Sequence, residues 1–342
     1  MASSAEVAAM RRALVLAQNP GVPLGPNPRV GCVLLDADGA VVAEGYHRGA
    51  GHPHAEIDAL TSAGERARGT TAVVTLEPCN HTGRTGPCAD ALLAAGVARL
   101  VYAQRDTNPV ARGGGEALRT AGVDVEGGVL ADEARAVNPI WTFAVENGRP
   151  YVTWKYAATL DGRSAAADGS SRWITSPEAR ADVHRLRAEC DAILVGTGTV
   201  LADNPHLTVR DVAGQALDVG RQPLRVVIGL RTVPADAAVL DDAAETLVLN
   251  TREPGEVLKR LLARYRQHVL LEGGPTLAGA FLREGLVDRV IAYFAPAFLG
   301  AGPAALSDAG VGTIADAIRL EITDMARVGP DVRLTAIRKE SS

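Results

Sequence analysis

The chain has 342 residues, of which 47% are hydrophobic and 22% charged, a balance that is ordinary for a globular protein of roughly two domains. Its formal net charge of −5 offers no basic surface to a polyanion, so we expect a small-molecule substrate and no nucleic acid as partner. The first residues contain no basic and apolar leader, and no run of about 18 apolar residues occurs. We therefore expect a cytoplasmic protein that does not contact membranes.

Apolar residues recur at helical spacing from Val7 to Ala17, and this pattern stops at a Pro- and Gly-rich stretch over 20–28. Strand-like and helix-like segments then alternate along the first half of the chain. The expected strands are 30–35, 71–76 and 97–103, and the expected helices are 55–64, 88–95 and 131–146. This alternation predicts a layered α/β fold.

The helical pattern breaks over 147–150, and a strand-like run begins at Tyr151. We place a domain boundary there, which gives domains 1–148 and 149–342. The second domain has expected strands at 151–157, 191–196, 224–229, 246–250, 268–272 and 288–294, and expected helices at 177–188, 255–265 and 276–285. Ser176 and Pro177 are typical of the start of the first of these helices. The pattern predicts a second α/β domain without internal repeats.

The most informative motif lies between residues 54 and 88. His54, Cys79 and Cys88 offer one imidazole and two thiolates, a ligand set that leaves one position of a catalytic zinc open for water. Glu56, two residues after the histidine, is then placed to act as general acid and base rather than as a ligand. This order of residues is typical of zinc nucleobase deaminases, although eight residues separate the two cysteines here instead of the usual two.

Other interpretations of these residues remain. His54 could cap a helix, and Cys79 and Cys88 could be buried thiols, which is the state that we expect for Cys32 and Cys190. The complete motif in its correct order favours zinc over this interpretation. We therefore take hydrolytic deamination as the first hypothesis for this half of the chain.

In the second half, two strands run into glycine-rich turns, at 196–205 and at 273–277. Such turns present backbone N–H groups to phosphate, and the two together predict a phosphate or dinucleotide site at the carboxyl ends of the strands. Lys155 lies on a strand face that is either exposed or lines this cleft. Arg180, His184 and Arg187 form a helical stripe, which is more often a solvated face than a binding site.

The insert between the two cysteines closely resembles the zinc site of the bifunctional riboflavin-biosynthesis deaminase–reductase family. Four later motifs resemble the reductase domain of the same family, so that the resemblance covers nearly the whole chain. They are Leu160-Asp161-Gly162-Arg163, Trp173-Ile174-Thr175, Leu201-Ala202-Asp203 and Glu272-Gly273-Gly274-Pro275-Thr276. The resemblance implies an N-terminal cytidine-deaminase-like three-layer α/β domain and a C-terminal dihydrofolate-reductase-like α/β domain.

The same resemblance implies a pair of reactions. The first is zinc-dependent hydrolytic deamination of 2,5-diamino-6-(5-phosphoribosylamino)pyrimidin-4(3H)-one, and the second is NADPH-dependent reduction of the ribosyl group to ribityl. The cofactors would be Zn²⁺ and NADPH, and the choice of NADP over NAD rests on the resemblance alone. Homo-oligomers are also expected from the family.

Site residues follow from the resemblance as well. Contacts to the deaminase substrate are implied for Asn27, His81 and Arg84. Contacts to NADPH are implied for Ala157, Trp173, Thr199, Asp203, Gly274, Pro275 and Thr276. Contacts to the sugar phosphate are implied for Ser171, Arg187, Leu207, Arg210 and Glu272. Lys155 and Asp203 are the candidate catalytic groups beside the carbon that is reduced.

Two other functions stay open at this point. One is a zinc-dependent deaminase of nucleosides or RNA, with a second domain that binds nucleotides without catalysis; the acidic net charge disfavours RNA. The other is a nucleotide-binding regulator with a structural zinc, which would usually have four protein ligands. Turnover of the nicotinamide cofactor distinguishes this regulator from the first hypothesis.

Overall fold

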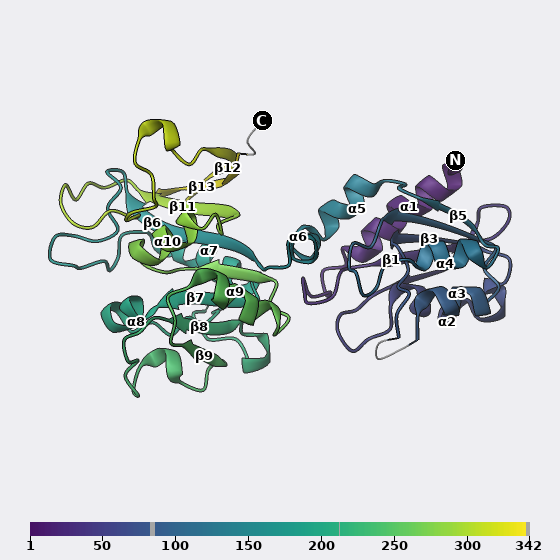
Figure 1. Cartoon of the computed structure of the whole chain (residues 1–342), viewed down its shortest axis with the longest axis horizontal. Coiled ribbons are helices and arrows are strands. Elements are labelled where there is room, and N and C mark those ends of the chain that lie inside the picture. Colours follow the sequence, from purple (N-terminus) through teal and green to yellow (C-terminus); the bar gives the residue numbers. More distant parts are fainter. Residues whose placement is uncertain (83–85, 212, 340–342) are drawn as a thin grey trace. The chain divides into compact units, whose positions relative to one another are not determined.

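The computed structural model describes residues 1–82, 86–211 and 213–339 (Figure 1). The chain divides into two compact units, Met1–Gly148 and Arg149–Ser342. Each unit has its own sheet and its own hydrophobic core. Within the described residues, no helix combines the length and the apolar character needed to cross a bilayer.

The first unit contains a five-stranded sheet in the order β2-β1-β3-β4-β5. Its strands are β1 (Gly31–Leu35), β2 (Val41–Tyr46), β3 (Thr71–Leu76), β4 (Arg99–Gln104) and β5 (Asp124–Gly127). β1 pairs antiparallel with both β2 and β3, and β3, β4 and β5 are parallel. Every residue of β1 is buried, because helices cover both faces of the sheet.

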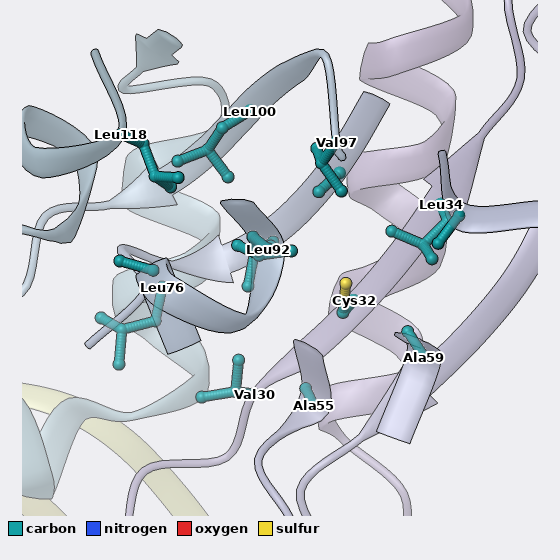
Figure 2. Close-up of a cluster of buried hydrophobic side chains, with 14 of the residues drawn as sticks. Val30, Cys32, Leu34, Ala55, Ala59, Leu76, Leu92, Val97, Leu100 and Leu118 are labelled. Atoms are coloured by element: carbon teal, nitrogen blue, oxygen red, sulfur yellow. The ribbon is translucent and has the colours of Figure 1, made fainter. Parts of the chain in front are cut away.

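The two helical layers of this unit have separate cores. α1 (Ser4–Ala17) and α5 (Ala131–Val137) pack on one face of the sheet. α2 (Ala55–Ala63), α3 (Cys88–Ala94) and α4 (Gly114–Thr120) pack on the other. Figure 2 shows this second core, where small residues of α2 and Leu92 of α3 lie close to Cys32. The three-layer fold and the burial of Cys32 are therefore confirmed.

The second unit contains an eight-stranded sheet in the order β12-β13-β11-β6-β10-β7-β8-β9. Its strands are β6 (Tyr151–Thr159), β7 (Ala192–Gly196), β8 (Leu224–Ile228), β9 (Thr246–Leu249), β10 (His268–Leu271), β11 (Arg289–Ala295), β12 (Leu320–Val328) and β13 (Asp331–Arg338). Neighbouring strands from β11 to β9 are parallel, and β12 and β13 are antiparallel. The carboxyl ends of the parallel strands therefore meet at one edge, where open α/β sheets bind ligands.

Helices cover both faces of this sheet as well. α9 (Pro254–Leu262) and α10 (Pro275–Arg283) contribute to one core. α7 (Pro177–Ala188) and α8 (Thr197–Asp203) contribute to clusters on the other face. Ser176 caps α7 by accepting a hydrogen bond from the N–H of Ala179, as expected. Short 3₁₀ segments cover Gly64–Ala67, Val219–Arg221, Ala238–Leu240 and Ile314–Asp316.

One expected element is wrong. The helix predicted over 131–146 is two helices, α5 and α6 (Pro139–Asn147), with Asn138 between them. The side-chain amide of Asn138 accepts a hydrogen bond from the N–H of Arg29 at 2.7 Å and donates one to its carbonyl at 2.8 Å. Pro139 has no N–H with which to continue α5. The chain therefore bends where Asn138 pairs with the backbone that leads into β1.

Candidate functional site

The metal-ligand candidates of the first unit come from three separate positions. His54 is the residue before α2, Cys88 is the first residue of α3, and Cys79 lies just after β3. α2 packs directly on β2, since a Cβ added to Gly45 would lie 2.4 Å from the carbonyl oxygen of Ala55. The fold therefore fixes the start of α2, and with it His54, against the sheet.

The donor atoms of His54, Cys79 and Cys88 all lie within 4.8 Å of one another. The Nδ1 atom of His54 is 3.2 Å from the Sγ of Cys88 and 3.7 Å from that of Cys79. Zinc–nitrogen and zinc–sulfur bonds of about 2.0 and 2.3 Å in a tetrahedral site place such atoms roughly 3.5 Å apart. One imidazole and two thiols at this spacing fit a zinc ion with one position left for water.

Without a metal, the two thiols share one proton, because their hydrogen bond lowers the pKa of Cys79 and, together with burial, raises that of Cys88. The hydrogen bond with Cys88 lowers the pKa of the Cys79 thiol to about 4, with a further contribution from His54. A thiol that ionises this readily is a good metal ligand. Glu56 is 4% exposed, and its burial raises the pKa of its carboxyl group. A raised pKa moves a carboxyl group toward the range in which it can both accept and donate a proton.

Asn27 lies beside this cluster because its side chain is hydrogen-bonded to His47, a residue that the sequence pattern did not single out. His47 lies with its ring centroid 5.3 Å from that of His54, and its Nδ1 is 2.8 Å from the carbonyl of Pro53. Because a carbonyl only accepts, this nitrogen carries the proton, and Nε2 accepts from the amide of Asn27 at 3.0 Å. His47 therefore holds Asn27 beside the metal-ligand candidates.

The insert between the cysteines contains the other two expected substrate contacts. His81 has a buried Nδ1 atom with no hydrogen-bond partner in the described part of the chain. An unpartnered buried nitrogen is costly, and a bound ligand would satisfy it. Arg84 lies outside the described residues.

Glu77, two residues before Cys79, forms hydrogen bonds with two backbone segments near the site. Glu77 is buried and accepts hydrogen bonds from the N–H groups of Asp106 at 3.2 Å and Gly115 at 3.1 Å. Burial raises the pKa of Asp106 to about 6. Glu77 therefore ties the segment after β4 and the start of α4 to the end of β3.

In the second unit, Lys155, Arg187 and Glu272 form a buried group of charges. Arg187 donates to the Glu272 carboxylate through Nε at 2.6 Å and Nη2 at 3.0 Å, and the Nζ of Lys155 lies 3.7 Å from it. Burial opposes ionisation of Glu272, but the two cations outweigh burial and lower its pKa to about 2. The structure excludes the exposed position that was one of the two possibilities for Lys155, since only 17% of its side chain is exposed.

The segment that follows α8 carries two more of the expected substrate contacts. Leu207 is buried and has a φ of 53°, so that the chain turns sharply at this point. The N–H of Arg210 donates to the ring of His184 on α7 at 3.3 Å. The stripe that contains His184 and Arg187 therefore faces other parts of the unit rather than solvent.

Ser171 and Asp203 meet at a shallow cavity, which is lined by residues 169–172 and by Ala202 and Asp203. The Ser171 hydroxyl donates to the Asp203 carboxylate at 3.4 Å. Trp173 is 69% exposed, and the guanidinium of Arg180 lies 4.3 Å from the centroid of its ring. An exposed tryptophan beside a polar cavity is a surface that a ligand can cover.

The two glycine-rich turns lie side by side at the carboxyl ends of the neighbouring strands β7 and β10. A Cβ added to Gly274 would lie 3.9 Å from the hydroxyl oxygen of Thr199, and one added to Gly273 would lie 2.6 Å from the side chain of Leu277. Glycine at position 273 therefore leaves room for Leu277 in the first turn of α10, which begins at Pro275. A glycine-rich turn that leads into a helix presents backbone N–H groups to the phosphates of a dinucleotide. Ala157, on β6, is half-buried.

Two family models match the chain. A model of the cytidine and deoxycytidylate deaminase zinc-binding region matches residues 3–104. A model described as the RibD C-terminal domain matches residues 150–334, more than half of the chain.

Curated relatives match over most of their length. A riboflavin biosynthesis protein RibD from Mycobacterium tuberculosis (strain H37Rv) is 51% identical over 316 residues, which cover 92% of each chain. The protein of the same name from Escherichia coli (strain K12) is 45% identical over 358 residues, covering 95% of this chain and 97% of the relative.

Two solved structures are similar to the chain over nearly its whole length. Acinetobacter baumannii RibD, form 1, has a TM-score of 0.85 at 38% identity and covers 98% of this chain and 99% of its own. A diaminohydroxyphosphoribosylaminopyrimidine deaminase/5-amino-6-(5-phosphoribosylamino)uracil reductase from Thermotoga maritima has a TM-score of 0.81 at 32% identity, with the same coverage. The chain belongs to the RibD family of riboflavin biosynthesis enzymes, in which a zinc-dependent deaminase is joined to an NADPH-dependent reductase.

Proposed function

We propose that the first unit deaminates 2,5-diamino-6-(5-phosphoribosylamino)pyrimidin-4(3H)-one, and that the second unit reduces the ribosyl group of the product to ribityl. The observation that carries this proposal is the cluster of His54, Cys79 and Cys88 with the buried Glu56 beside it. The reaction pair named for the Thermotoga maritima structure supports the choice of substrate.

In the deaminase site, His54, Cys79 and Cys88 would hold zinc, which when bound activates water for attack on the ring carbon that carries the amino group. Glu56 accepts a proton from this water and returns it to the departing nitrogen, which leaves as ammonia. Asn27, His81 and Arg84 would orient the ring and the phosphoribosyl group, and His47 would position Asn27.

In the reductase site, NADPH supplies the hydride when it is bound. Lys155 is the candidate proton donor to the sugar, because burial lowers the pKa of its ammonium group and makes it a stronger acid. Asp203 would be the second candidate catalytic group beside the carbon that is reduced. Glu272 would accept hydrogen bonds from sugar hydroxyls.

The remaining contacts complete the second site. Arg187 and Arg210 would bind the phosphate of the sugar, with Ser171 and Leu207 beside it. NADPH would lie against Ala157, Trp173, Thr199, Asp203, Gly274, Pro275 and Thr276. We further propose a cytoplasmic homo-oligomer that acts on small phosphorylated substrates.

Replacement of the proton carrier tests the first half of this proposal. In the full-length protein, Glu56→Gln should lower the rate of ammonia release from the diaminopyrimidine ribotide by about 100- to 10,000-fold, the usual contribution of a general acid and base. Zinc content should stay at the wild-type level, because Glu56 is not a ligand. Oxidation of NADPH with the already deaminated ribotide should not change.

The exposed Glu65, in the short 3₁₀ segment that follows α2, offers a matched Glu→Gln control that should leave deamination intact. A Glu56→Gln protein that loses its zinc together with its activity would show that this carboxylate is a ligand. A zinc-loaded wild-type protein that releases no ammonia from the ribotide would overturn the proposed deamination.

A further inference from the structure

The chain between α8 and β8 forms a narrow ribbon of two arms that carries Arg210, one of the expected phosphate contacts. At the base of the ribbon, the N–H of Leu217 donates to the carbonyl of Val209 at 3.1 Å. Arg210 itself pairs with Ala216 in an antiparallel bridge. Both arms lie outside the strand order of the sheet, so their outer backbone groups need other hydrogen-bond partners.

Gln222, two residues before β8, holds both arms at the base of the ribbon. Its side-chain Oε1 accepts a hydrogen bond from the N–H of Val209 at 2.7 Å. Its Nε2 donates to the carbonyls of Val209 at 3.1 Å and of Leu217 at 2.8 Å. An amide side chain offers both the acceptor and the two donors that this arrangement requires. Gln222 therefore pairs with Val209 as a neighbouring strand would, and it ties the ribbon to the start of β8.

The opposite edge of the same segment is held by α7. The carbonyl of Thr208 accepts a hydrogen bond from Nη1 of Arg187 at 3.0 Å, and the N–H of Arg210 donates to the ring of His184 at 3.3 Å. Burial, with a smaller contribution from Arg187, lowers the pKa of His184, which favours the neutral ring that can accept this bond. In an extended chain the polar groups of successive residues point to opposite edges, so Val209 faces away from α7.

The two arginines of this region differ in how their donors are used. Arg187 already donates to the carboxylate of Glu272 through two nitrogens. Among the described residues, the guanidinium of Arg210 donates one hydrogen bond, to the carbonyl of Gly214 at 3.0 Å. Its remaining donors match the oxygens of a phosphate group. The direction in which they point depends on the backbone of Arg210, which is held next to the pair of Val209 and Gln222.

We infer that Gln222 is a positioning residue for the recognition of the substrate phosphate in the second unit. It acts through the backbone of Val209 rather than by contact with the substrate, and it thereby fixes the direction of the Arg210 guanidinium. This inference rests on the proposed reductase function and on the phosphate contact of Arg210. A guanidinium held at a wrong angle loses its paired hydrogen bonds to phosphate even where the fold is intact.

Reductase kinetics of the full-length protein test this role. The deaminated ribotide and its dephosphorylated riboside differ only in the 5′-phosphate, so the KM of the ribotide and the inhibition constant of the riboside against it isolate that group. Gln222→Met removes all three hydrogen bonds and should raise the KM for the ribotide by about 10- to 100-fold, the range for a hydrogen bond to a charged group. The kcat for the ribotide, the inhibition constant of the riboside and the KM for NADPH should stay unchanged.

Gln222→Glu has nearly the same shape and serves as a second variant. It keeps an acceptor for the N–H of Val209 but loses both donors, so the KM for the ribotide should rise here too. An unchanged affinity for NADPH shows for each variant that the second unit is folded. Gln215→Met, at an exposed position on the same ribbon, is the matched control and should keep the wild-type constants.

Three results would contradict these expectations at different levels. A wild-type KM for the ribotide in both Gln222 variants would overturn the inference, as would an equal loss of affinity for the riboside. Equal affinities of the wild-type protein for ribotide and riboside would overturn the phosphate contact of Arg210, and the inference with it. A wild-type protein that oxidises no NADPH with the ribotide would instead overturn the proposed reductase function.

Discussion

The two sites are built in different ways. In the first unit, three donor atoms within 4.8 Å of one another come from the starts of two helices and the end of one strand. In the second unit, the candidate residues are spread along the ends of several parallel strands, and the central charges are paired with each other. A metal ion needs a few atoms at fixed distances, whereas a dinucleotide and a sugar phosphate need an extended surface.

The loss of one metal ligand should break the first site and leave the second one intact. Cys88→Ala should abolish zinc binding and lower deamination by more than about 1,000-fold, since the metal contributes several kcal/mol to the reaction. NADPH oxidation with the deaminated ribotide should stay at the wild-type rate. Metal analysis and the two assays check this, with Cys190→Ala as a buried-cysteine control. An equal fall of both activities would show that the sites are not separate.

Loss of Glu272, the shared partner of Arg187 and Lys155, should destabilise the second unit. Glu272→Gln leaves Arg187 and Lys155 buried beside a neutral amide, which should lower the free energy of unfolding of the second unit by about 3–5 kcal/mol. Urea unfolding followed by the fluorescence of the buried Trp154 measures this change. The exposed Glu284→Gln is the control, and equal stability of the two variants would contradict the role of the buried group.

The second unit should also lose stability in mild acid. His268 is buried, and burial, with a smaller contribution from Arg289, lowers the pKa of its ring from 6.5 to about 4. Below pH 6.5 the unfolded chain binds a proton that the folded chain does not, so the free energy of unfolding should fall by up to about 3 kcal/mol between pH 6.5 and 4. His268→Gln should flatten this dependence, and the exposed His52→Gln should not. Identical slopes would rule out His268 as the cause.

The smallest expected effect concerns the start of α7, the helix that carries Arg187. Ser176→Ala removes the oxygen that accepts the N–H of Ala179 and should cost about 1 kcal/mol of stability. If the cap also positions Arg187, the KM for the reductase substrate should rise while kcat stays constant. Thermal unfolding and steady-state kinetics test both points. An unchanged melting temperature would show that the cap is dispensable.

The sequence predicted the first site well because its chemistry lies in short motifs. His54, Cys79 and Cys88 follow from their spacing, and both helix starts were expected. His47 was missed because β2 was not expected. Gly45 weakens the strand pattern there, and the close approach of α2 is what requires a glycine at this position.

The second site was less predictable because its partners are distant in the chain. Nothing near Lys155 indicates that Glu272 and Arg187 would meet it, since this depends on the order of the parallel strands. The hairpin of β12 and β13 was also missed. Nearly all of β12 is exposed, so the alternation of buried and exposed residues that marks a strand is absent there.

The end of α6 has a consequence for how this enzyme can be divided. Trp141 of α6 belongs to the core of the first unit, and the helix ends at Gly148 with a φ of 61°. The next residue, Arg149, already forms an ion pair with Asp288 of the second unit. A gene split at this codon would sever no strand of either sheet. Each of the two resulting polypeptides would keep its own sheet and its own hydrophobic core.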